Sequence, residues 1–319
     1  MRVGQNPAKF VGEVAKPQRI TVAVLTYIPF LSGFFARTLD VLKLCLGSIW
    51  ETADLPYDLL VFDNGSCAEA REVLRQAHGE GRIQFLVLSE KNLGKGGAWN
   101  VIFAAAPGEI IAYSDSDALF YPGWLSKSVR VLETYPNVGM VTSRPFRTPP
   151  EFYSNTLAWA AQTHGVQVEQ GQLIPWEVLF EFDRSLGQGE VEIRKRYERT
   201  SDVRLSYDLL PAYVGASHWQ FVAKKSVLHQ FLPFEMDRPM GQVRQLDQRM
   251  NEAGYLRLMT AEPLAMNMSN TPPMAYVART AADPSHRRRR RNRLLHAQWV
   301  KRGLLALYDR IFRWYYADS

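Results

Sequence analysis

Apolar runs and segments of helical periodicity alternate along the first 120 residues. Four short runs of apolar and β-branched residues have the character of buried strands, at residues 20–26, 59–62, 83–88 and 110–113. Apolar positions at helical spacing separate them, at residues 38–49, 69–77 and 92–106. Strands that alternate with helices build a parallel sheet with right-handed crossovers. The pattern therefore predicts an α/β fold with a mostly parallel sheet flanked by helices.

The regular pattern continues to residue 142 and then weakens. Residues 122–135 have a helical period and residues 138–142 read as a strand. From 144 to 211 aromatic and charged residues are frequent and no clear period holds, which we interpret as a variable excursion off the sheet. Helical signals return at 224–231 and 241–253, and residues 256–259 and 264–268 are predicted to be closing strands.

Composition indicates a globular protein with a sizeable core. The chain has 319 residues, of which 46% are hydrophobic and 22% charged. Cys45 and Cys67 are the only cysteines, so neither a disulfide framework nor a cysteine metal site is expected, and a reducing cytoplasm fits best. The N-terminus lacks the apolar stretch of a signal peptide, and no apolar run reaches the ~18 residues of a membrane span.

The two ends of the chain differ from its body. Residues 1–18 are predicted to be a flexible arm, and residues 271–285, with three prolines, a linker or flap. The remaining 19–270 would form the main domain. Residues 286–319 carry ten Lys and Arg against two Asp, a balance of +8, whereas the whole chain is +6. The basic character therefore belongs to the tail.

The tail also has apolar residues at helical spacing, including Leu304, Leu307, Ile311 and Trp314. A basic helix with an aromatic and aliphatic face is typical of a helix that lies on an anionic membrane surface, here through residues 287–316. A helix docked on the body or on a partner chain is the alternative. Nucleic acid is not an expected partner, because the body has no matching excess of basic residues.

Two carboxylates, Asp115 and Asp117, follow the apolar run at 110–113. Open α/β sheets bind ligands beyond the carboxyl ends of their strands, so these side chains stand where a site is expected. Two neighbouring carboxylates repel each other unless a cation lies between them. A hard divalent ion, Mg²⁺ or Mn²⁺, bridging a diphosphate would explain the pair, and a plain polar turn is the alternative.

Four elements after predicted strands now stand in order: Thr26-Tyr27, Asp63-Asn-Gly-Ser66, the glycine-rich turn from Asn92 to Asn100, and Asp115-Ser-Asp117. This order resembles family 2 glycosyltransferases of the GT-A (Rossmann-like) fold, over about residues 20–270. The resemblance implies a nucleotide-diphosphate sugar donor, a divalent metal, and transfer with inversion at the anomeric carbon. It also makes residues 144–211 the acceptor side.

The resemblance assigns roles to individual residues of the donor site. Thr26 and Tyr27 would line the nucleotide, and Asp63 would accept a hydrogen bond from the base or ribose. The turn from Asn92 through Gly94 to Asn100 would border the donor, with Lys95 facing phosphate. Asp117 would bind the metal, and Asp115 would reach the ribose or a metal-bound water.

The proton acceptor is less clearly marked. The family usually places Glu-Asp at the start of a helix that ends in Arg and Gly-Tyr. Arg249 and Gly254-Tyr255 match this ending, but Gln242 and Val243 stand at the two acidic positions. Asp247 lies one turn further along the same helix face and could act as the base, with Asp237 as its rival.

Contacts to the acceptor and a third metal ligand are also open. Trp219 could stack on a sugar face, and His218 could hydrogen-bond a hydroxyl or phosphate. A family histidine that often supports the metal is not evident, and Asn267 and Asn270 stand in that region.

These observations predict an inverting, metal-dependent glycosyltransferase with a glycan or lipid-linked acceptor. The expected location is the cytoplasm, and the basic tail would make the protein peripheral at the inner membrane face. A sugar-phosphate nucleotidyltransferase would need a glycine-rich basic signature after the first strand, which residues 26–29 lack. A non-catalytic nucleotide-sugar or glycan-binding protein stays open because of Gln242 and Val243.

Overall fold

The computed structural model describes residues 4–237 and 243–273. The chain divides into two units, residues 1–272 and 273–319, and the fold below is that of the first. The main strands in the described residues are β1 Ile20–Thr26, β2 Tyr57–Asp63, β3 Phe85–Leu88, β4 Ile110–Asp115, β6 Val138–Thr142, β7 Gln167–Gly171, β8 Asp202–Tyr207, β9 Leu210–Val214, β10 Gln220–Lys224 and β11 Leu256–Thr260.

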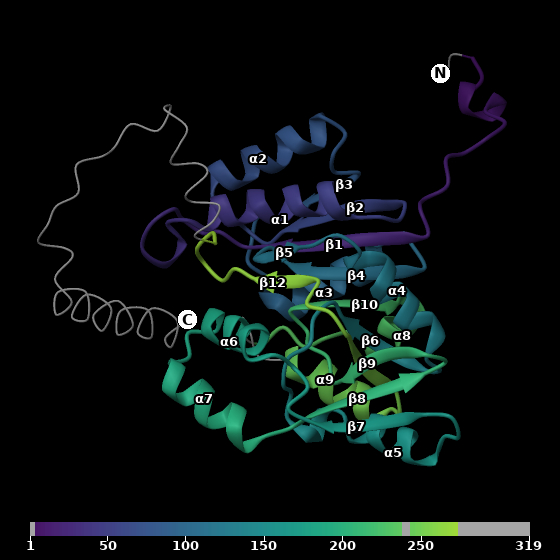
Figure 1. The fold of residues 1–319 in the computed structure, drawn as a ribbon. Helices are drawn as coiled ribbons and strands as arrows, with labels where there is room; N and C mark the ends of the chain where they lie inside the picture. The colour runs from purple at the N-terminus through teal and green to yellow at the C-terminus, as the bar shows by residue number, and fades with distance from the viewer. Residues whose placement is uncertain (1–3, 238–242, 274–319) are drawn as a thin grey trace, which may run out of the picture. The chain divides into compact units, whose positions relative to one another are not determined.

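These strands form one ten-stranded sheet in the order β3-β2-β1-β4-β10-β6-β11-β9-β8-β7 (Figure 1). The first four are mutually parallel, with Val24 of β1 level with Val61 of β2 and Ser114 of β4. β6, β11 and β8 run the same way, whereas β10, β9 and β7 run the opposite way. The predicted α/β class with a helix-flanked sheet is confirmed, and the carboxyl ends of β1, β2 and β4 meet at one edge.

Helices cover both faces of the sheet (Figure 1). Alternate residues of β1 belong to different cores, Val22 and Val24 to one and Ala23 and Leu25 to the other. Burial on both faces explains why these strands are continuous apolar runs in the sequence. The first face packs against α1 Thr38–Thr52, α2 Ala68–Gly79 and α4 Trp124–Thr134, and the second against α3 Gly94–Ala105, α8 Lys225–Leu228 and α9 Val243–Glu252.

Residues 144–211 differ from the prediction. They contain η3 Pro150–Phe152, α5 Ser154–Gln162, α6 Trp176–Ser185 and α7 Glu190–Arg199, and β7, β8 and β9 extend the main sheet. The interpretation as an excursion off the sheet is therefore wrong for these three strands. The edge strand β7 is largely exposed on both faces, so it lacks the apolar pattern by which strands are recognised in sequence.

Two strands, β12 Ala265–Asn267 and β10, differ from the predicted arrangement of the last strands of the sheet. β12 pairs with β5 Ala118–Phe120 in a separate two-stranded sheet, so only the 256–259 prediction, now β11, joins the main sheet. β10 was missed by the sequence analysis. It lies antiparallel between β4 and β6 and brings residues 217–219 to the edge where β4 ends.

The segment before β1 is exposed in the residues that the structure describes. Residues 4–19 are exposed, and the short helix η1 Pro7–Phe10 buries none of its residues. The two remaining short helices are η2 Gly33–Phe35 and η4 His229–Phe231. Cys45 and Cys67 are free thiols, and Cys45 is buried. The predicted linker beyond residue 273 and the predicted basic helix at 286–319, with its membrane contact, lie outside the described residues.

Among the described helices, none is both long and apolar enough to span a bilayer.

Candidate active site

A cavity of about 320 Å³ opens where β1 and β4 end and α3 begins. Its walls include Tyr27, Asn64, Asn92, Lys95, Asp115 and Asp117. Turns that were far apart in sequence therefore converge on one edge of the sheet, as the predicted parallel strands require. Phe34 and Phe35 of η2 and Ser269 complete the rim.

The carboxylate of Asp117 lines the cavity and has one oxygen without a hydrogen-bond partner among the described residues. Its Oδ1 is buried and accepts no hydrogen bond from any residue that the structure describes. Burial, and then the charge of Asp115, raise the pKa of Asp117 to about 7, while the charge of Lys95 acts in the opposite direction. A buried carboxylate oxygen without a partner is costly unless a cation or a proton binds it. Asp117 is thus suited to hold a cation.

Asp115 is already engaged. Its Oδ2 lies 2.6 Å from the Lys95 ammonium, and its Oδ1 accepts a hydrogen bond of 2.6 Å from the Tyr113 hydroxyl. Burial, and then the charge of Asp115, raise the pKa of Tyr113. The phenol therefore keeps its proton and donates a hydrogen bond to Asp115. The Asp115 N–H donates to the Trp219 carbonyl at 2.8 Å. These contacts fix Asp115 beside Lys95.

Lys95 is held by the first turn of α3. The side chain is 6% exposed, and its ammonium lies 5.4 Å from the Trp99 ring centroid and 5.7 Å from that of Tyr113. Trp99 in turn belongs to an aromatic cluster of the second core with Phe103, Tyr113, Phe221 and Phe234. The packed rings leave Lys95 a fixed cation at the cavity wall.

Two asparagines shape the turn that precedes α3. The Asn92 Oδ1 accepts hydrogen bonds from Gly94 N at 2.8 Å and from Asn64 Nδ2 at 2.9 Å. The Asn64 Oδ1 accepts from Leu93 N at 2.8 Å. Gly94 has φ +67°, a conformation that glycine adopts without strain. Asn92 therefore lines the cavity as predicted, whereas Gly94 shapes the turn without lining it. Asn64, which the sequence analysis did not select, lines the cavity and joins the two turns.

The glycines after Lys95 serve close packing. A Cβ on Gly96 would lie 2.5 Å from the Glu235 carbonyl oxygen. The segment at 234–236 therefore approaches α3 more closely than any residue with a side chain would allow. The glycine-rich turn thus joins α3 to this segment as well as bordering the cavity.

Thr26 and Asp63 do not line the cavity. Thr26 is fully buried at the end of β1, and the next residue, Tyr27, reaches the cavity instead. Asp63 is also fully buried and accepts hydrogen bonds from Ser66 N and, at 2.9 Å, from Arg71 Nε. In the structure Asp63 therefore stabilises the turn after β2, and no surface of it is left for a base or ribose.

Asn100 also differs from its predicted place. Its Nδ2 donates to the Phe234 carbonyl at 2.9 Å, and its Oδ1 accepts from Phe234 N at 2.7 Å. The side chain therefore binds a backbone segment rather than facing the cavity.

Asn100→Ala is expected to lower the free energy of unfolding by about 1–3 kcal/mol, because it leaves backbone groups of Phe234 unpaired. Nucleotide-sugar affinity should change little. Urea unfolding measures the first effect and a thermal shift with donor the second, with exposed Gln162→Ala as control. Unchanged stability together with lost donor binding would restore the donor-site interpretation of Asn100.

The predicted base and acceptor residues lie on the other side of Asp115. Asp247 of α9 is 5% exposed, with its Oδ2 2.7 Å from His218 Nδ1 and its Oδ1 2.5 Å from Arg257 Nη2. Trp219 is buried, and its ring packs 5.7 Å from that of Phe182. The rival base, Asp237, does not line the cavity.

The described residues contain no group of three or more His, Cys, Asp or Glu arranged to hold a metal ion. Asn267 Oδ1 accepts from Ser269 N at 2.7 Å, and Asn270 Nδ2 donates to the Phe34 carbonyl at 3.0 Å. Both asparagines therefore shape the cavity rim. Mg²⁺ and Mn²⁺ sites of nucleotide enzymes often use one or two carboxylates plus phosphate and water, a requirement that Asp117 and Asp115 fit.

A larger cavity of about 610 Å³ lies between η3 and strands β7 to β9. Its half-buried Arg147 already pairs with Asp202 at 2.6 Å and donates to Tyr197 and Gln172. Size alone therefore does not mark it as the centre of the chemistry.

A model of the family described as Glycosyl transferase family 2 matches residues 34–204. The match covers just over half of the chain. The chain belongs to glycosyltransferase family 2. The predicted family is thereby confirmed, and with it the general class of enzyme. The match ends within β8, so the family 2 model does not reach His218, Asp247 or Arg257.

The individual proteins that resemble this family 2 chain share either a short stretch of sequence or a low overall identity. It is 30% identical over 100 residues to an uncharacterized glycosyltransferase of Nostoc sp., a stretch that is 31% of each chain. It therefore spans about a third of that relative.

Solved structures show similar chains. One is the mannosyltransferase PcManGT from Pyrobaculum calidifontis in complex with GDP-Man and Mn²⁺, with 18% identity, a TM-score of 0.44, and coverage of 82% of this chain and 56% of that one. Another is S. aureus TarS 1–349 in complex with UDP, with 12% identity, a TM-score of 0.44, and coverage of 76% and 58%.

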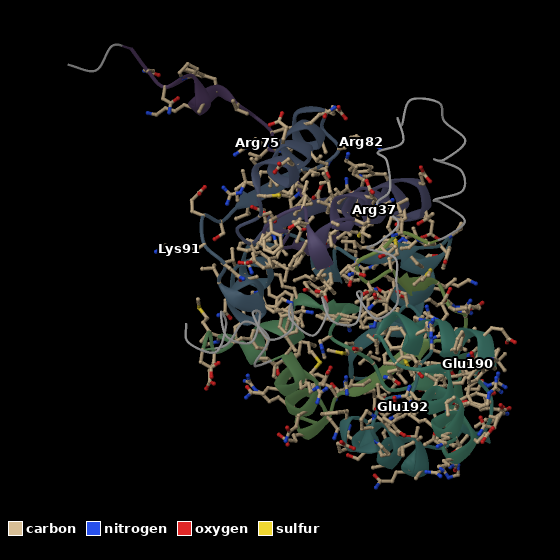
Figure 2. All side chains as sticks on the ribbon, turned by 90° about the vertical axis from the view of Figure 1, so that its left-hand side faces the viewer. Arg37, Arg75, Arg82, Lys91, Glu190 and Glu192 are labelled. Carbon is tan, nitrogen blue, oxygen red and sulfur yellow. The ribbon has the colours of Figure 1, made fainter. Side chains whose placement is uncertain are left out.

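Charged side chains lie on both halves of this family 2 domain (Figure 2). Figure 2 labels four basic side chains in the half that holds α1 and α2, namely Arg37, Arg75, Arg82 and Lys91. Glu190 and Glu192 lie in the other half, on α7.

Proposed function

We propose that this member of family 2 transfers a sugar from a nucleotide-diphosphate sugar to an acceptor hydroxyl with inversion, using Mn²⁺ or Mg²⁺. The observation that carries the proposal is the buried, unpartnered Oδ1 of Asp117 beside the Lys95–Asp115 pair. A cation on Asp117 and the ammonium of Lys95 would give a diphosphate two positive partners at the edge of the sheet. The family resemblance is the reason for expecting inversion.

The residues of the cavity have separate tasks in this mechanism. Tyr27 and the Asn64–Asn92 pair border the nucleotide, and Lys95 faces the diphosphate. When bound, the divalent ion, held by Asp117 and Asp115, would neutralise charge on the leaving nucleoside diphosphate. The acceptor hydroxyl must approach the anomeric carbon from the side opposite the diphosphate and give its proton to a base.

The acceptor is proposed to be a glycan or a lipid-linked sugar. Phe30 and Phe34, 43% and 51% exposed, stand in the loop that rims the cavity. Exposed aromatic rings beside a polar cavity suit a sugar face or an apolar chain. Attachment to the inner membrane face through residues 287–316 remains a proposal for a segment beyond the described residues.

The proposal predicts that one class of nucleotide-sugar will stabilise the protein only with metal. UDP-, GDP- and dTDP-linked sugars are screened by thermal shift, each with Mn²⁺ and with EDTA. A donor at about 100 times its dissociation constant adds about 2.7 kcal/mol of stability. No shift with any donor would contradict the proposal, and binding without turnover on any acceptor or water would favour a non-catalytic binding protein. NMR of the product anomer checks inversion.

A further inference from the structure

The second polar cluster at this edge is a chain of three side chains from three elements. His218 precedes β10, Asp247 lies on α9 and Arg257 on β11. The Asp247 carboxylate bonds His218 Nδ1 at 2.7 Å through Oδ2 and Arg257 Nη2 at 2.5 Å through Oδ1. We refer to these residues as the His218–Asp247–Arg257 chain.

Asp247 is poorly placed to touch an acceptor itself. It is 5% exposed, and both of its oxygens are engaged. Arg257 is fully buried and also donates to the Ala216 carbonyl at 2.6 Å and the Phe152 carbonyl at 2.5 Å, so it cannot move away. A fixed guanidinium holds the Asp247 carboxylate oriented toward His218.

His218 is the member of the chain that reaches solvent. Its side chain is 22% exposed, and its Nε2 bonds no residue among those the structure describes. The Asp247 carboxylate accepts a hydrogen bond, so His218 Nδ1 must carry the hydrogen. The neutral ring therefore has its lone pair on Nε2. This is the arrangement in which an imidazole can accept a proton.

The backbone brings His218 to the catalytic edge. The carbonyl of the next residue, Trp219, accepts the Asp115 N–H at 2.8 Å, and Gln220 pairs with Ser114 in the sheet. His218 is therefore one residue from a direct contact with Asp115.

We propose that His218 Nε2 takes the proton of the acceptor hydroxyl and that Asp247 is the positioning residue for it. This inference rests on the proposed function. In the step, the acceptor O–H bond breaks and its proton moves to His218, while the oxygen forms a bond to the anomeric carbon. The bond from that carbon to the diphosphate oxygen breaks, and the electron pair leaves with the nucleoside diphosphate.

The proposal assigns the role that carboxylates at 242 and 243 would otherwise fill. Gln242 and Val243 cannot accept a proton at neutral pH. The charged groups that surround His218 are Asp247 on α9, Arg257 behind it on β11, and Asp115 on the strand paired with β10.

The test compares His218→Gln and His218→Ala with the control His229→Gln. His229 does not line the donor cavity, and its Nε2 bonds the Phe103 carbonyl. The readout is release of nucleoside diphosphate from the nucleotide-sugar that passes the donor screen, with water as acceptor. Both His218 variants should lose at least about 100-fold in kcat and keep the wild-type donor-induced thermal shift. Added imidazole should restore part of the rate to His218→Ala, and the fall in rate at low pH should disappear.

The role of Asp247 has its own readout. Asp247→Asn should lower kcat without changing the donor KM, and nitrogen NMR of the wild-type protein should find the neutral His218 ring protonated on Nδ1. A Nε2–H ring, or His218 variants with the rate and pH profile of the wild type, would overturn the inference.

Two outcomes separate this inference from the proposed function. A wild-type protein that no nucleotide-sugar stabilises would remove the proposed function. Normal donor binding, with nucleotide release that His218→Gln leaves unchanged, would remove only the role of His218. Donor binding without any release by the wild type would also contradict that role, because a positioned base would activate water.

Discussion

Asp117→Asn is expected to abolish metal-dependent donor stabilisation and to lower the rate of nucleotide release by about 1000-fold, since a catalytic metal contributes several kcal/mol. The variant keeps the size of the side chain but replaces the buried, unpartnered Oδ1 by a neutral group. Thermal shift with Mn²⁺ and a turnover assay measure the two effects. Asp208→Asn, at an exposed turn between β8 and β9, is the matched control. Mn²⁺-dependent donor binding that survives in Asp117→Asn would contradict this assignment.

The same substitution should stabilise the metal-free protein at alkaline pH. Burial raises the pKa of Asp117 from 3.8 to about 7. Between these values the folded protein binds more protons than the unfolded chain, so its stability falls as pH rises. Since one pKa unit corresponds to about 1.4 kcal/mol, removal of this charge should raise the free energy of unfolding by about 2–4 kcal/mol at pH 8 and by little at pH 4.

Urea unfolding in EDTA at pH 4 to 8 checks this difference between wild type and Asp117→Asn. The difference should grow with pH through the window and level off above about pH 7. Mn²⁺ affinity of the wild type should rise over the same window, because the proton and the cation compete for one carboxylate. A variant that is less stable than the wild type at pH 8 would show that Asp117 has a stabilising partner.

The donor half was predictable because its strands are buried on both faces. Val22, Ala23, Val24 and Leu25 are all buried in apolar cores, so four apolar residues in succession precede Thr26, and the strand end is visible in the sequence. Asp115 and Asp117 stand directly after such a run. Their placement at the edge followed from the run and from the parallel topology alone.

The roles of Asp63 and Asn100 could not be predicted in this way. Asp63 is bound by Arg71 on the next helix, and Asn100 by the backbone of Phe234, 134 residues further along the chain. A polar residue in a motif has the same sequence signature whether it faces a ligand or binds another segment of the chain. Arg257 presents the same difficulty, since a lone arginine in the strand Leu256–Thr260 gives no sign that it is fully buried.

Asp247→Ala is expected to destabilise the protein by about 3–5 kcal/mol, because it leaves the buried Arg257 without its counter-ion. Burial already lowers the pKa of Arg257, and the charge of Asp247 is what opposes this. Urea unfolding measures the loss. Asp40→Ala, which breaks the exposed pair with Arg37, should cost only about 0–1 kcal/mol and serves as control. A loss from Asp247→Ala no larger than this control would mean that Arg257 is not truly desolvated.

A second substitution separates the structural from the catalytic value of this pair. Asp247→Leu combined with Arg257→Met removes both charges while filling similar volume, so it should regain part of the stability lost by Asp247→Ala. The recovery should be incomplete, because the Ala216 and Phe152 carbonyls lose their donor. If the double variant approaches wild-type stability yet releases nucleotide as slowly as His218→Gln, the ion pair serves chiefly to hold His218. If it is stable and fully active, the pair is a structural element of α9 and β11, and His218 acts without it.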